Sequence, residues 1–552
     1  MTVALDLADI QGNILTAYGK LGFPKGRFIT LHIDEPAAGR AFVIALLPKI
    51  TTALRWRSVR ARIGTGAHEV ERPPVTVNIA FSWLGLLALG APTRTLRGMP
   101  DEFIDGMAAR AAMLGDDDLE TGAPPRWDEV WPTNAGRGGD EKSVHILISL
   151  NAQVNPDGGA VADLDTVTNE IEALCKNVIC KNGKGVRVLP GHNRPGQTPA
   201  RYQELSAMMR RGADGTVSPL PTEHFGFTDA IGDPVFEGQY PNAAQLRPEV
   251  GHGAFDGAGV WRPLATGEFL LGYPDEAQEI AGAAMPLSFS RNGTFMAYRK
   301  LHQNVATFRA FMAGAAAQYG AVTGIESRED AVALLMAKFA GRWSDGVPLS
   351  RAPTIAAWKQ FNKDFPQVSP TADPERYYKR DQALSLFTFG DDGDGVKCPV
   401  GSHLRRVNTR DSMGPTASAG SVLTNRRRIL RRGLPYGDST DGVADSDEHG
   451  IVMLAVCASL FRQFEFVQQQ WINYGLDARA GNDACPLVGN HSAGGVSGPP
   501  AKFVVPSDPN SGRPPFIVER LPQFVETRGG EYFFVPSMTA LRMLGMGVID
   551  PT

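Results

Sequence analysis

The chain has 552 residues, of which 43% are hydrophobic and 21% charged, and its formal net charge is −4. This composition is typical of a soluble globular protein with roughly two to four domains, and the small negative charge gives no overall attraction to nucleic acid or an anionic membrane. No run of about 18 apolar residues occurs, so no membrane span is expected.

The N-terminus and the cysteines predict a cytoplasmic location. Residues 1–15 lack a basic segment and a long apolar segment, and Asp6 and Asp9 stand where a signal peptide would be apolar. The five cysteines are an odd number without dense spacing, which argues against a disulfide framework. We therefore expect a reduced, cytoplasmic protein, with leaderless export left open.

The first part of the chain predicts a ferredoxin-like unit. Strand patterns with apolar and β-branched residues alternate with helical patterns in the order strand, helix, strand, strand, helix, strand. The expected strands are 29–34, 74–82, 143–152 and 185–191, and the main expected helices are 38–54 and 163–178. We assign residues 1–215 to an N-terminal ferredoxin-like domain.

The second part again mixes strands and helices, and we assign residues 216–552 to a C-terminal domain that could repeat the architecture of the first. The expected strands are 267–276, 293–301, a stretch within 426–438, 450–460 and 531–537. Helices are expected over about 303–340, over 461–473 and near the C-terminus. The fold class predicted from these patterns is α+β.

A turn-rich stretch, KCPVGSHLRRVNTRD over residues 397–411, holds one histidine, His403. A neutral imidazole is a common haem and metal ligand, although an isolated histidine is more often a structural one. Cys398 is a rival ligand through its thiolate, but its surroundings do not match thiolate-ligated monooxygenases. No HExxH or paired CxxC motif is present, so a zinc site is not expected.

Asp229 lies in the turn GFTDAIGDP, residues 226–234. Taken alone, an aspartate between small residues is a common turn former. In a functional site the same carboxylate could take up or relay a proton.

Five of the seven residues 426–432 are arginine, in the segment RRRILRRGLPYG. This run could be a solvated basic patch or a nucleic-acid contact, but it could also be a strand that carries one arginine inward to stabilise negative charge. Further along, Glu465 lies between two phenylalanines in QFEFVQQQW. It is either a surface residue or the acceptor for the second ring N–H of a ligand histidine.

In order along the chain, these segments resemble the dye-decolourising peroxidase family. The resemblance rests on DIQGNIL, VNIAFSWLGLLALG, FGFTDAIGDP, GEFLLGY, CPVGSHLRRVNTRD, ILRRGLPYG and QFEFVQQQW, which together extend over nearly the whole chain. It implies two ferredoxin-like domains with antiparallel sheets in an α+β barrel arrangement, and haem b in the second domain.

Carried over by motif, the resemblance implies that His403 is the proximal haem ligand and the metal ligand, Asp229 the distal acid, and Arg431 the distal arginine beside the haem. Glu465 would hold His403 by a hydrogen bond. Arg432 is the alternative to Arg431.

Two positions depart from the family pattern. The last glycine of the distal motif is Ala230, and Gly433 stands where some members have asparagine. These departures bear on how peroxide is positioned rather than on haem binding.

The implied activity is reduction of hydrogen peroxide coupled to one-electron oxidation of dyes, phenols or similar aromatic donors. Donors too bulky to reach the haem would pass electrons through surface aromatic residues, which the sequence does not rank. The alternative is a haem-binding, haem-storage or iron-releasing protein with little turnover. No nucleic-acid or membrane partner is expected, and assembly into a homo-oligomer is left open.

Overall fold

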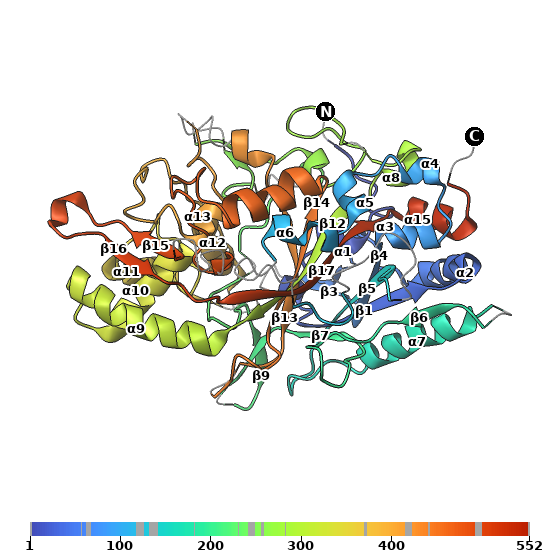
Figure 1. Cartoon of the computed structure of the whole chain (residues 1–552), viewed down its shortest axis with the longest axis horizontal. Helices are drawn as coiled ribbons and strands as arrows, with labels where there is room; N and C mark the ends of the chain where they lie inside the picture. The colour runs from blue at the N-terminus through green and yellow to red at the C-terminus, as the bar shows by residue number, and fades with distance from the viewer. Residues whose placement is uncertain are drawn as a thin grey trace.

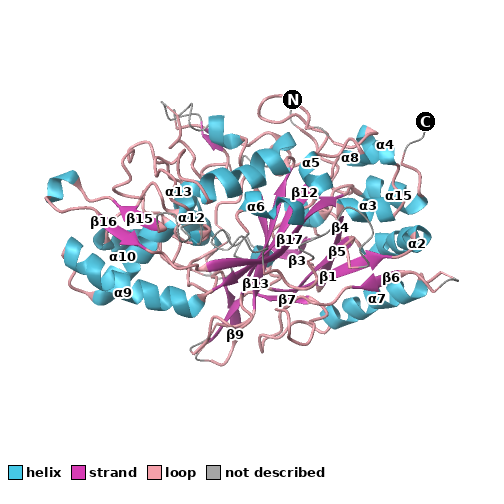
Figure 2. Cartoon of the chain, in the orientation of Figure 1, coloured by secondary structure: helices cyan, strands magenta, loops and turns pink. Residues whose placement is uncertain are grey.

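The structure, a computed structural model, is dominated by one nine-stranded sheet (Figures 1 and 2). Along the sheet the strands run β13-β14-β12-β17-β4-β5-β1-β6, and β7 pairs with β1 beside β6. The structure describes residues 3–56, 58–61, 68–116, 126–131, 142–180, 183–212, 214–229, 231–240, 249–255, 259–281, 283–368, 373–414, 422–439, 442–491 and 500–549.

The N-terminal unit contributes one half of this sheet. Its elements are β1 (Lys25–Ile33), α2 (Pro36–Leu46), β4 (Val75–Phe81), β5 (Ile146–Ala152), α7 (Asp163–Asn177) and β6 (Val186–Val188). Every residue of β4 and β5 is buried, and the apolar side chains of Val75, Val77, Ile79 and Phe81 in β4 share one face of the sheet. The helix α7 begins with two acidic residues and has Lys176 in its last turn, which suits the helix dipole.

The C-terminal unit contributes the other half. Its sheet elements and main helices are β12 (Thr294–Gln303), α9 (Val305–Thr323), α10 (Arg328–Ala340), β13 (Leu430–Tyr436), β14 (Gly450–Cys457), the π-helical segments η6 (Leu460–Glu465) and η7 (Val467–Ile472), and β17 (Val525–Val535). Between α10 and β13 lie α11 (Ile355–Asp364), α12 (Pro374–Ser385) and α13 (His403–Val407). A small sheet of β15 (Lys502–Val505) and β16 (Phe516–Glu519) precedes β17, and α15 (Met538–Met546) follows it.

The two units have the same topology. In each unit the four strands lie in the order second, third, first, fourth, namely β4-β5-β1-β6 and β13-β14-β12-β17, and all neighbours are antiparallel. The predicted pair of ferredoxin-like sheets is therefore confirmed. The two sheets join where Phe534 of β17 pairs with Phe81 of β4, while β7 (Gln203–Ser206) contacts β13 and brings the far edges together. The domain boundary at residue 215 stays a prediction.

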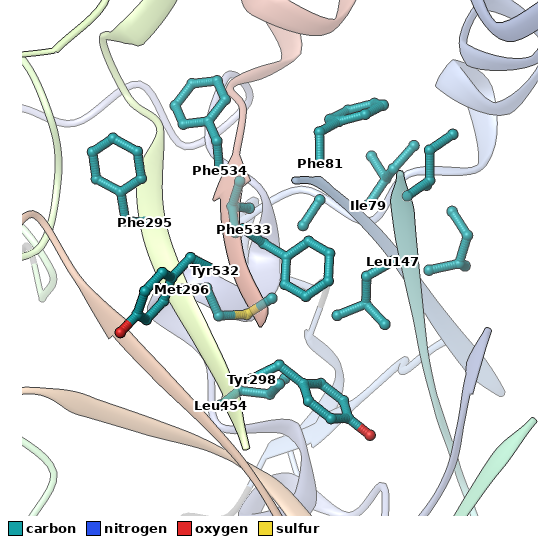
Figure 3. Close-up of a cluster of buried hydrophobic side chains, with 14 of the residues drawn as sticks. Ile79, Phe81, Leu147, Phe295, Met296, Tyr298, Leu454, Tyr532, Phe533 and Phe534 are labelled. Atoms are coloured by element: carbon teal, nitrogen blue, oxygen red, sulfur yellow. The ribbon is translucent and has the colours of Figure 1, made fainter. Parts of the chain in front are cut away.

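A large apolar core spans the join between the two units. Figure 3 shows the side chains that meet there, among them Ile79, Phe81, Leu147, Phe295, Met296, Tyr298, Leu454, Tyr532, Phe533 and Phe534. A second core lies among α9, α10 and the β15–β16 pair, at the left of Figure 1, and includes Phe225, Phe308, Trp343, Cys398 and Cys485. This second core surrounds the segments in which the sequence placed the site.

Three expectations for local structure were wrong in detail. Residues 267–276 do not form a strand: a 3₁₀ turn (Thr266–Glu268) begins there, and the backbone of Gly267 packs so closely against Tyr273 that a Cβ would lie 2.2 Å from its carbonyl oxygen. The helical region 303–340 is two helices, because the chain breaks at Gly324, which has a φ of +74°. The helix over 461–473 is wound mainly as a π-helix. No helix within the described ranges is long and apolar enough to cross a membrane.

Candidate active site

His403 is the first residue of α13, a short helix that a tight turn presents to the second core. The N–H of Ser402 donates to the carbonyl of Pro399 at 3.0 Å, and the Cys398 sulfur lies 3.1 Å from the Ser402 hydroxyl. Cys398 is fully buried, and burial raises the pKa of its thiol. Cys398 therefore belongs to the turn that leads into His403, as the sequence suggested.

The charged residues around His403 anchor this turn. The carboxylate of Asp392 accepts from the backbone N–H groups of Lys397 and Cys398, both at 2.9 Å, and from Arg405 at 3.0 Å. Arg406 is buried and donates to the carbonyl oxygens of Gly401, Trp471, Tyr474 and Asp483. Two arginines that looked like surface charge thus fix the orientation of α13.

The imidazole of His403 is half-buried, and its two nitrogens differ. Nδ1 lies 3.3 Å from the sulfur of Cys485. Within the described part of the chain Nε2 has no hydrogen-bonding partner. An imidazole held on one nitrogen, with the other available, is the arrangement that metal-binding histidines adopt.

Asp229 and Arg431 lie together, although 202 residues separate them in the sequence. Nη1 of Arg431 donates to Oδ1 of Asp229 at 3.0 Å, and Nη2 donates to the carbonyl of Ile231 at 3.3 Å. The negative charge of Asp229 raises the pKa of Arg431. The structure therefore brings these two residues of the predicted distal pair together.

Both side chains are partly open to solvent. The accessible fractions are 43% for Arg431 and 45% for Asp229. A small molecule can therefore reach both the guanidinium and the carboxylate.

A short segment after α10 connects this pair with His403. A Cβ on Gly341 would lie 2.7 Å from Cβ of Leu404, the residue after His403. Three residues further, the carbonyl of Ser344 accepts from the N–H of Thr228 at 2.8 Å, and Thr228 precedes Asp229. Since three residues span at most about 11 Å, the histidine turn and the Asp229 loop border the same region.

Glu223 is a residue of this region that sequence reasoning missed. It is buried, and its carboxylate accepts from the N–H groups of Phe225 and Phe227, each at 2.8 Å, and from Gln303. Burial raises its pKa to about 7. Glu223 therefore holds the loop that carries Asp229. Its position directly before His224 and the FGF segment was the available signal.

The predicted contact between Glu465 and His403 is wrong. The Glu465 carboxylate accepts from Nη2 of Arg110 at 2.7 Å and from the hydroxyl of Tyr532 at 2.7 Å. Arg110 lies in the N-terminal unit, 355 residues away in sequence, so Glu465 links the two units. The side chain that meets Nδ1 of His403 is Cys485, which was not among the residues selected from the sequence.

The arginines of residues 426–432 do not form one basic surface. Arg426 pairs with Asp275 at 2.9 Å, while Arg427 stacks on Phe466 and donates to the carbonyl of Arg462. Arg432, the alternative distal residue, does not contact Asp229 but donates to the carbonyls of Asn13 and Ile14, both at 2.9 Å, and to Asp233.

The two departures from the family pattern have different outcomes. Gly433 has a φ of +110°, and a Cβ there would lie 2.0 Å from the carbonyl oxygen of Val452. Glycine is therefore required at this position of β13, and asparagine does not fit this backbone. Ala230 lies outside the described residues.

The residues around this region fit a group that combines a metal with carboxylates, as haem does. Arg342 donates to the carbonyls of Gly346 and Leu384, both at 2.8 Å, and Arg410 donates to those of Ser385 and Gly251. Burial lowers the pKa of Arg342 to about 9. Burial also lowers the pKa of Arg410, and the positive charges of Arg428 and Arg342 lower it further. Clustered, buried positive charge of this kind is suited to an anion such as a haem propionate.

Comparisons with known proteins agree with this architecture. The family model described as "DyP dimeric alpha+beta barrel domain" matches residues 9–192. Peroxidase 2 of Mycetinis scorodonius is 27% identical, over 98% of this chain and 88% of its own length. A DyP-type peroxidase structure from Auricularia auricula-judae is 24% identical with a TM-score of 0.65, over 98% of this chain and all of the other. A dye-decolorizing peroxidase in complex with 2,6-dimethoxyphenol is 23% identical with a TM-score of 0.66, over the same share of each chain.

Proposed function

The chain belongs to the dye-decolorizing peroxidase family of peroxide-dependent oxidoreductases, and we propose that His403, Asp229 and Arg431 carry this activity with haem b as the cofactor. The enzyme reduces hydrogen peroxide and oxidises dyes, phenols or similar aromatic donors in one-electron steps. The observation that carries the assignment of residues is the 3.0 Å contact between Arg431 and Asp229, in a region that the histidine turn also borders.

When bound, haem supplies an iron that binds peroxide and gives the electrons that cleave the O–O bond. His403 would hold the iron through Nε2, while its Nδ1 remains on Cys485. Arg342 and Arg410 would supply positive charge for the carboxylates of the haem.

Asp229 acts as the proton carrier. Its carboxylate accepts a proton from one oxygen of hydrogen peroxide and returns it to the other, which makes that second oxygen a neutral leaving group. Glu223 keeps the Asp229 loop in place through the backbone of Phe225 and Phe227.

Arg431 stabilises the negative charge that develops on the peroxide oxygens. Its guanidinium is already oriented by Asp229 and by the carbonyl of Ile231, so little reorganisation is needed during the reaction.

The test is peroxide-dependent oxidation of 2,6-dimethoxyphenol by the haem-loaded protein and by Asp229→Asn. We expect turnover in the wild type and a loss of about 10²–10⁴-fold in the variant, the usual contribution of a proton-transfer group. Asp233→Asn is the matched control, because Asp233 pairs with Arg432 at 2.9 Å, outside the proposed proton path. Haem binding without peroxide-dependent oxidation would instead identify a haem carrier.

A further inference from the structure

The proposed ligand histidine, His403, contacts a thiol. The sulfur of Cys485 is 3.3 Å from Nδ1 of His403, and Cys485 is fully buried. The nearest acidic candidate from the sequence, Glu465, is held by Arg110 and Tyr532 instead.

The backbone fixes the position of this thiol. The N–H of Cys485 donates at 2.6 Å to the carbonyl of Ile472, the last residue of η7. The carbonyl of Cys485 accepts from the N–H of Gly489 at 3.0 Å and lies 2.9 Å from Nε2 of His491. A Cβ on Gly489 would come within 2.7 Å of that carbonyl, so the turn around the cysteine is closed tightly. The backbone contacts therefore fix the Cys485 side chain next to the imidazole of His403.

The direction of the hydrogen bond follows from the role of His403. A ligand Nε2 must present its lone pair to the metal, so in the neutral ring the hydrogen sits on Nδ1 and is donated to the acceptor behind it. Here that acceptor is sulfur, which is a weak acceptor compared with a carboxylate. A weak acceptor leaves the imidazole less basic and the ferric state less stabilised than a carboxylate would.

We infer that Cys485 is a positioning residue, which fixes the tautomer and orientation of His403 and sets the reduction potential of the iron at a higher value than a carboxylate at this place would give. The inference rests on the proposed function, because it takes His403 as the haem ligand. It concerns no residue that touches peroxide or the reducing substrate.

The test compares the ferric/ferrous midpoint potential and the ferrous iron–histidine stretching frequency of the haem-loaded wild type, Cys485→Asp and Cys485→Ala. Cys485→Asp should lower the potential and raise the frequency. We expect a change of at least tenfold in the ratio of ferric to ferrous affinity, which is about 59 mV for a one-electron couple. Cys485→Ala removes the acceptor and should shift both quantities the opposite way, so the test holds even if the buried carboxylate prevents folding.

Cys457→Ala is the matched control, because Cys457 is an equally buried thiol on β14. Potentials of the Cys485 variants that stay within the range of this control would overturn the inference while leaving the proposed function intact. Absence of an iron–histidine vibration in the wild type would show that the ligand assignment itself has failed.

Discussion

Arg431 and Arg432 are neighbours on β13 with opposite surroundings, and their substitution by leucine should separate catalysis from stability. Arg431 is 43% accessible and contacts Asp229, whereas the side chain of Arg432 is only 5% accessible. Arg431→Leu should therefore slow the reaction with peroxide, and Arg432→Leu should destabilise the fold.

The magnitudes follow from what each side chain contacts. Loss of a preorganised donor to a developing negative charge costs about 10²–10³ in rate, or ~2.7–4 kcal/mol. The Arg431–Asp229 pair is 43% and 45% accessible, so its loss should change the free energy of unfolding by less than about 1 kcal/mol. Arg432→Leu leaves Asp233 and two buried carbonyls without their donor, which should cost ~3–5 kcal/mol.

The assay pairs stopped-flow measurement of the peroxide reaction in the haem-loaded protein with urea unfolding of the same samples. Arg432→Lys, which keeps the charge, covers the case in which Arg432→Leu does not fold. The reasoning would be refuted if Arg431→Leu reacted at the wild-type rate, or if a folded Arg432 variant lost the rate that we assign to Arg431.

Three further outcomes are expected. Glu465→Gln should lower the free energy of unfolding by ~1.5–3 kcal/mol, because it weakens the charge-assisted hydrogen bonds from Arg110, which keeps Asp105 as a second partner. It should leave the Soret band unchanged; a shifted band would place Glu465 at the ligand after all. Burial lowers the pKa of His192 to about 3 and that of His302 to about 4, so the unfolded chain takes up protons below pH 6.5 that the folded protein does not. Their contribution to the free energy of unfolding is complete above pH 6.5 and is lost as the pH falls toward 4, by up to about 1.4 kcal/mol per pH unit for each histidine. Tm should therefore fall over this pH range, and His302→Gln should reduce the slope of Tm against pH. Equal slopes in the wild type and the variant would contradict this. Trp358 is half-buried and stacks on the buried Trp343 with ring centroids 4.5 Å apart, so the pair offers a path for electrons from the surface. Trp358→Phe should slow oxidation of a bulky dye about tenfold, ~1.4 kcal/mol, and leave oxidation of 2,6-dimethoxyphenol unchanged. If the variant oxidised both donors at the wild-type rates, this path would be excluded.

The regular elements could be predicted from the sequence because their patterns are local. The alternating β1, the fully buried β4 and β5, and the amphipathic α7 all form where expected. The strand prediction for residues 267–276 was wrong because the apolar residues of this segment are buried in turns. The backbone of Gly267 packs closely there against another part of the segment, and no strand forms.

Site residues that lie in a recognisable sequence motif could be predicted. Contacts between residues that are distant in the sequence could not. His403, Asp229 and Arg431 could be named from their segments, and the last two do meet. Glu465 was given the wrong partner because its true partner, Arg110, comes from the other unit. Cys485 was missed because it lies 82 residues from His403 in the sequence, and only the fold brings the two side chains together. Cys398 and Cys485 both precede a proline in a glycine-containing turn, CPVG and CPLVG, and this repeated pattern was a usable signal.

The most direct test of the account is the absorption spectrum of the haem-loaded His403→Ala protein beside the wild type and Cys398→Ser. Nε2 of His403 is the proposed axial ligand, whereas the Cys398 thiol only contacts the Ser402 hydroxyl. The account predicts that His403→Ala loses the wild-type Soret band and that Cys398→Ser retains it. An unchanged Soret band in His403→Ala would contradict the central claim that this histidine holds the iron.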